Sequence, residues 1–148
     1  MIKKWILILF LILLLNNCGL MNKYKENKIT KLYVSVTQIL AQQIELKTKQ
    51  AQLLFEMNKN LEKLERQYKR IYPKKKFVYE ELDLEQIKKD FPEKFVAIEK
   101  LVTQIKEAGE TVKRLREKDL ELEEEKIKQI LKMDKLDPEF KYHDKIEI

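Results

Sequence analysis

Hydrophobic and polar residues follow each other along most of this chain with the spacing of an amphipathic helix. Between residues 29 and 71 there is no glycine or proline, and apolar side chains recur at steps of three and four, with a slip of one residue after Met57. Two glutamines occupy positions of the same stripe. The pattern predicts a long helix over 29–71 with a stripe formed by Leu32, Val36, Ile39, Gln43, Leu46, Gln50, Leu53, Met57, Leu61, Leu64, Tyr68 and Ile71.

A second periodic segment covers residues 92–133 and begins at Pro92, a residue that the first turn of a helix tolerates. Gly109 lies inside it, where a glycine indicates either a close helix approach or a bend. The spacing predicts a helix with a narrow seam made of Ile98, Leu101, Ile105, Ala108, Val112, Leu115 and Leu122, with Asp119 in a polar position, continuing through Ile127, Ile130 and Leu131.

Two segments of similar length joined by residues 72–91 predict an all-α fold, a long antiparallel helical hairpin or coiled coil. Within the linker, Asp83 with Gln86 three residues later predicts a capped short helix that ends near Asp90. Residues 134–148 follow as a loose C-terminal tail. The hairpin therefore occupies residues 29–133.

Charge supports this pairing. Residues 19–77 contain 14 basic and 5 acidic residues, a net charge of +9, whereas residues 78–148 contain 15 basic and 20 acidic residues, a net charge of −5. Helices of opposite charge attract when they lie side by side, although each exposed pair contributes less than ~1 kcal/mol.

A two-helix hairpin has a thin core with one seam, so it often needs a further helix to bury the rest of its apolar surface. Five apolar residues of the first segment lie off its main stripe. They predict either a second contact, with another copy of the chain or with a partner helix, or simply a wider seam. These residues are Val34, Leu40, Ile44, Leu54 and Phe55.

The N-terminus has the organisation of a secretory signal. Lys3 and Lys4 precede an apolar run from Trp5 to Leu15, which is shorter than the ~20 residues that a membrane-spanning helix needs. Asn16 and Asn17 then lead to Cys18, the single cysteine of the chain. We therefore expect residues 1–17 to be a signal peptide, and the alternative is a short uncleaved membrane anchor.

The sequence Leu15-Asn16-Asn17-Cys18 resembles the lipobox of bacterial lipoproteins. The resemblance implies cleavage between Asn17 and Cys18, with lipid on the sulfur and the new amino group of Cys18. Residues 18–28 would then be a lipidated tether, and the membrane would be a partner through that lipid. The expected location is the bacterial cell envelope, with the outer membrane or cell surface favoured over the inner membrane.

Catalysis and metal binding have little support in the sequence. A single cysteine excludes an intrachain disulfide and a multi-cysteine zinc site. His143 lies in the tail, and consecutive side chains such as Glu123, Glu124 and Glu125 point in different directions on a helix. No phosphate-binding glycine loop or metal-spaced histidine motif occurs. We expect no enzymatic activity, no metal and no cofactor.

The linker is basic and aromatic. Lys74, Lys75 and Lys76 lie beside Phe77 and Tyr79, and this group is either a partner contact or a solubilising turn. Export makes nucleic acid an unsuitable partner. The expected partners are the membrane, the chain itself as a homo-oligomer, or another envelope or host protein.

The expected architecture resembles that of the FadA-type adhesins, small exported helical hairpins. This resemblance favours a surface protein that acts by adhesion or other protein–protein contact. The alternative is a periplasmic structural or chaperone-like role, similar to helical-arm chaperones of the Skp kind.

Overall fold

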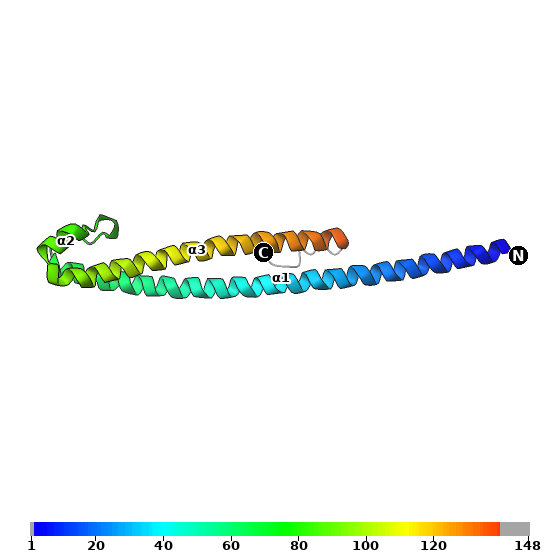
Figure 1. The fold of residues 1–148 in the computed structure, drawn as a ribbon, viewed down its shortest axis with the longest axis horizontal. Helices are drawn as coiled ribbons and strands as arrows, with labels where there is room; N and C mark the ends of the chain where they lie inside the picture. Colours follow the sequence, from blue (N-terminus) through cyan, green and yellow to red (C-terminus); the bar gives the residue numbers. More distant parts are fainter. Residues whose placement is uncertain (1, 140–148) are drawn as a thin grey trace. The chain divides into compact units, whose positions relative to one another are not determined.

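The computed structural model describes the backbone of residues 2–139 and the side chains of residues 19–139. Its elements are α1 (Ile2–Ile71), a short 3-10 helix (Tyr79–Glu81), α2 (Leu84–Asp90) and α3 (Pro92–Leu136). Figure 1 shows the three α-helices. No strand occurs in residues 2–139. The predicted all-α helical hairpin is confirmed, with α1 packing against α3.

Both long helices extend beyond their predicted bounds. The predicted first helix began at residue 29, but α1 is continuous from Ile2, so the backbone of residues 18–28, expected to be a tether, is helical. No proline occurs before residue 73, and Gly19 alone does not interrupt the helix. The second helix ends at Leu136 and not at residue 133, shortly before Pro138.

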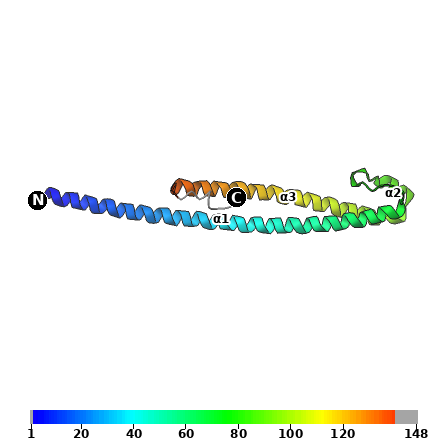
Figure 2. The ribbon, with the colours of Figure 1, turned by 180° about the vertical axis from the view of Figure 1, so that it is seen from behind.

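The described chain divides into two compact units, each with its own core. Unit 1 pairs the part of α1 up to Gln43 with the part of α3 from Glu121 onwards. The two segments run in opposite directions and lie side by side along the α3 segment, whereas the N-terminal part of α1 continues beyond it (Figure 2). Its small core consists of the buried residues Val36, Ile130 and Met133, against which Ile29, Leu32 and Leu40 pack.

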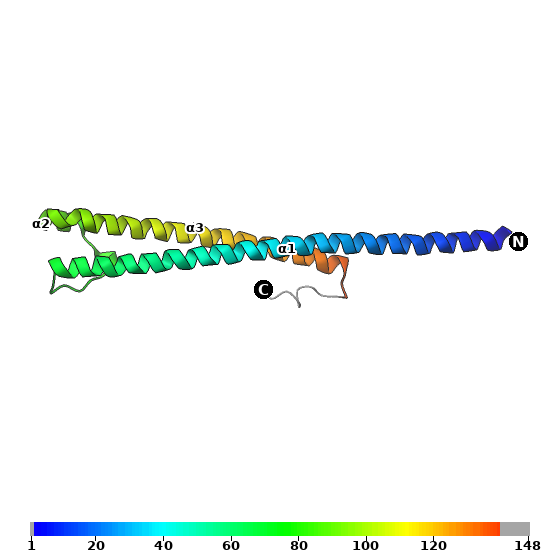
Figure 3. The ribbon, with the colours of Figure 1, turned by 90° about the horizontal axis from the view of Figure 1, so that it is seen from below.

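Unit 2 covers residues 44–120 and contains the linker. Figure 3 shows α2 and the linker where α1 ends and α3 begins. The linker adds a third element to this core, because Ile87 of α2 is only 1% exposed and packs with residues of both long helices. The buried residues of the cluster are Leu64, Ile87, Ile98, Val102 and Ile105.

The predicted cap of α2 is present. Asp83 Oδ1 accepts a hydrogen bond from the backbone N–H of Gln86 at 2.9 Å. The Gln86 side chain does not return this bond to the backbone of Asp83. It donates instead to Asp90 Oδ2 at 2.7 Å. The Asp83 side chain thus caps the start of α2, and the Gln86 side chain contacts the last residue of α2.

The predicted seam is correct for most positions and wrong near the end of α3. Ile127 and Leu131 were assigned to the seam but are 39% and 51% exposed, whereas Lys126 is only 3% exposed. Beyond Leu122, the residues that face α1 follow steps of four, to Lys126 and Ile130. An α-helix has 3.6 residues per turn, so a strict seven-residue repeat drifts around it, and the position that faces α1 moves by one residue.

Gly109 does not mark a close helix approach. A Cβ atom built at this position would meet nothing within 4 Å, and α3 continues through it without interruption.

Candidate functional site

The predicted contact at the linker begins with a tight turn after α1. The backbone N–H of Lys75 donates to the carbonyl of Tyr72 at 3.0 Å, with Pro73 between them in the position that such turns favour. The Lys75 ammonium lies 4.4 Å from the centre of the Tyr72 ring. Lys74, Lys75 and Lys76 are all exposed. The turn therefore presents its three lysines to solvent.

Phe77 and Tyr79, the aromatic members of the predicted contact, pack inward. Both are half-buried against the core of unit 2, and the Phe77 ring lies 5.5 Å from the Tyr68 ring. Burial, and then the nearby carboxylate of Glu80, raise the pKa of Tyr79. The outward part of the predicted contact is thus the three lysines, while the two aromatic residues hold the linker onto the hairpin.

A small polar network holds the end of α2 near the end of α1. Asp90 Oδ2 accepts hydrogen bonds from Gln86 and from the Tyr72 hydroxyl, the latter at 3.0 Å. These two bonds, Gln86 first, keep the pKa of Asp90 below its ordinary value. Partial burial and the bond to Asp90 raise the pKa of Tyr72. The network therefore favours the charged carboxylate and the neutral phenol.

The residues predicted to lie off the main stripe of α1 fall into two groups. Leu40 packs against the core of unit 1, and Leu54 is half-buried. The other three are 50–71% exposed in the described chain, namely Val34, Ile44 and Phe55. Leu40 therefore widens the seam, whereas a second contact through the three exposed residues stays a prediction.

Unit 1 contains a buried polar group that the hydrophobic pattern did not predict. Lys126 Nζ lies 2.8 Å from Glu123 Oε1, and Glu123 Oε2 accepts a hydrogen bond of 2.8 Å from Gln43 Nε2. Gln43, which the pattern placed on the stripe, is only 4% exposed. A glutamine on an apolar stripe is a sequence signal for a polar partner on the facing helix.

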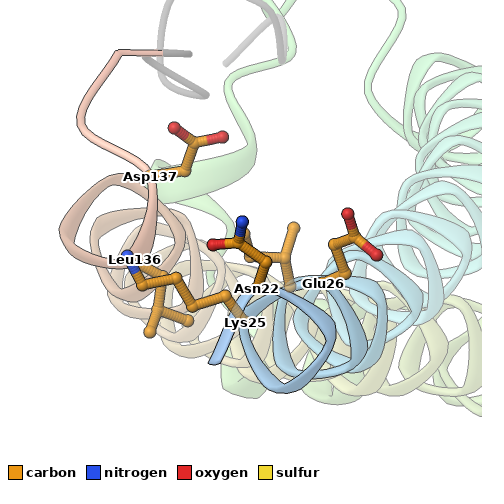
Figure 4. A pocket seen from close by; sticks show the side chains of 6 residues that line it. Asn22, Lys25, Glu26, Leu136 and Asp137 are labelled. Carbon is orange, nitrogen blue, oxygen red and sulfur yellow. The ribbon is translucent and has the colours of Figure 1, made fainter. Parts of the chain in front are cut away.

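A shallow hollow of about 220 Å³ lies where α3 ends in unit 1. Figure 4 shows that it is lined by Asn22, Lys25 and Glu26 of α1 and by Leu136 and Asp137. Acidic, basic and apolar side chains share its rim, and they do not converge on one point in the way that a catalytic or ligand site requires.

The side chains of Asn17 and Cys18, the predicted cleavage and lipidation residues, lie outside those described. Across residues 19–139, no helix is both long and apolar enough to cross a membrane. Among the same residues, no cluster of three or more His, Cys, Asp or Glu side chains is placed to hold a metal ion.

No protein-family model matches the chain, and comparisons with curated proteins and with solved structures find no match.

Proposed function

We propose that this chain is a lipid-anchored protein of a bacterial cell envelope that acts at the cell surface by protein–protein contact, without enzymatic activity. Its anchor is the lipid on Cys18, in the lipobox-like sequence Leu15-Asn16-Asn17-Cys18. Several acyl chains, each contributing ~0.8 kcal/mol per buried CH₂ group, hold such a protein firmly on a membrane.

The observation that carries the contact function is the exposed, uncharged outer side of α1. Ile44 is 67% exposed and Phe55 is 71% exposed, and both lie on a series of exposed uncharged residues spaced by three or four positions. The series is Thr30, Tyr33, Thr37 and Ala41 in unit 1, and Ile44, Thr48, Ala51 and Phe55 in unit 2.

The threonines of this series support the same interpretation. The Thr37 and Thr48 hydroxyls donate to the carbonyls of the residues four positions earlier, at 2.9 and 2.8 Å. Because the hydroxyls are satisfied inside the helix, the threonines offer mainly methyl groups to a neighbour. Small and apolar residues at this spacing are what a partner helix packs against.

Protease treatment of intact cells tests the location. We expect the chain to be digested while a soluble periplasmic marker in the same cells is spared. A chain that survives in intact cells, but is digested once the outer membrane is opened, would favour the periplasmic structural or chaperone-like role instead.

Substitutions on α1 test the contact in the same cells. We expect Ile44→Glu combined with Phe55→Glu to abolish the adherence of the cells. The accessibility of the chain to protease and its helix content should stay unchanged. The matched control is Gln42→Glu with Gln52→Glu, which adds the same charge at exposed positions of the same helix. Adherence that is equal in both variants would exclude this side of α1 as the contact.

A further inference from the structure

Basic residues gather where α1 and α2 end and α3 begins, all within unit 2. Residues 65–76 and 88–94 together contain nine basic and three acidic residues, a net charge of +6. All nine basic residues are exposed. We call this set of two segments the basic end.

The contacts between elements show that these segments are neighbours. The Tyr72 hydroxyl bonds to Asp90 at 3.0 Å, and the Tyr72 and Phe91 rings lie 5.3 Å apart. The Lys88 ammonium lies 5.5 Å from the centre of the Phe95 ring. Lysines that are distant in the sequence are therefore held on one part of the surface.

Little of this charge is neutralised within the described chain. Glu65 pairs with Lys69 at 2.6 Å, and no other basic residue of the set forms an ion pair within residues 19–139. Asp90, the second carboxylate of these segments, accepts hydrogen bonds from Tyr72 and Gln86. Glu93 is the third. The acidic part of the linker includes Glu80, which lies near Val102 and Lys106, farther along α3 than the basic end.

We infer that the basic end binds the phosphate headgroups of an anionic lipid membrane. Its basic side chains are long, exposed and contributed by two segments of the chain, so they suit a surface that offers phosphate at many positions. Each lysine or arginine near an anionic membrane adds attraction, and the effect falls within a Debye length of ~8 Å at physiological salt. The inference adds a lipid contact to the protein contact proposed above and relies on that proposal for the anchor alone.

Vesicle tethering tests the inference with the full chain. The protein from cell membranes is reconstituted into neutral phosphatidylcholine vesicles, and flotation of the protein with them reports the anchor by itself. A second set of vesicles, with or without phosphatidylglycerol, is then added, and their co-localisation is counted. We expect capture of the phosphatidylglycerol vesicles only, with capture decreasing as salt rises.

Charge reversal locates the contact. Lys74→Glu, Lys75→Glu and Lys76→Glu together should weaken capture about a hundredfold. The control replaces three exposed lysines of α1 and produces the same net charge: Lys47→Glu, Lys49→Glu and Lys59→Glu. The control variant should keep most of the vesicle capture. Equal loss in both variants would overturn the inference, and so would capture of neutral vesicles alone. Binding of polyglutamate but not of phosphatidylglycerol vesicles would replace it with an acidic protein partner.

Discussion

Gly109 lies in the interior of α3 with open space where a Cβ atom would be. A glycine in a helix interior costs about 1 kcal/mol relative to alanine, because it loses more backbone entropy on folding. Gly109→Ala should therefore raise the free energy of unfolding by about 1 kcal/mol, measured by urea denaturation. Ala108→Gly, at the neighbouring position, should lower it by at least a similar amount. A destabilising Gly109→Ala would mean that a partner approaches α3 at this point.

Lys126 is the buried charge of unit 1, and its ammonium faces Glu123. Lys126→Glu places two carboxylates together in a site with little water, which should cost about 3–5 kcal/mol of stability. Lys128→Glu makes the same charge change at an exposed position two residues later and should change stability by less than about 0.5 kcal/mol. Circular dichroism during urea denaturation compares the two. Similar midpoints for both variants would show that Lys126 is not buried in solution.

The seam could be predicted at the positions where apolar residues recur without interruption. Val36, Ile98 and Ile105 were predicted to face the opposite helix, and all three are buried. The prediction failed at Ile127, because the seam was traced through apolar residues alone and Lys126 beside it was left out. A long lysine side chain can bury its methylene groups and reach a carboxylate, and an alternation of apolar and polar residues does not reveal that pairing.

At the scale of elements, the linker is the part that the sequence described least well. Its lysines and the Asp83 cap were predicted, whereas the return of residues 77–91 onto the hairpin was not. The signal lay in the apolar content of this stretch, which includes Phe77, Leu82 and Ile87. So many apolar residues in a short linker need a surface to bury them, but their irregular spacing does not say which surface.

Ile87 anchors α2 to unit 2, since it is 1% exposed and belongs to the core cluster. Ile87→Ala leaves a cavity that typically costs 2–5 kcal/mol, and the loss falls first on the element that the residue attaches. We expect hydrogen exchange to accelerate through residues 79–91 while α1 and α3 keep their protection. Lys89→Ala, an exposed position of the same helix, is the control. Unchanged exchange in α2 of the Ile87 variant would mean that other contacts hold the linker.

At the scale of the whole molecule, three features are carried by different parts of the chain. The lipobox-like sequence ends at Cys18, the exposed uncharged series lies on α1 between Thr30 and Phe55, and the basic end lies within residues 65–94. None of the three depends on the chemistry of a catalytic site. A protein with this distribution suits a role in holding other molecules near a membrane, which is the role that we propose.

The anchor is the central claim, because both proposed contacts take their place in the cell from it. Intact-mass spectrometry of the chain extracted from bacterial membranes tests it directly. We predict a mature chain that begins at Cys18 and carries the added mass of its lipids, and we predict that Cys18→Ala leaves an unprocessed precursor without lipid. A chain from the same membranes that still begins at Met1, with an unmodified thiol at Cys18, would contradict the account.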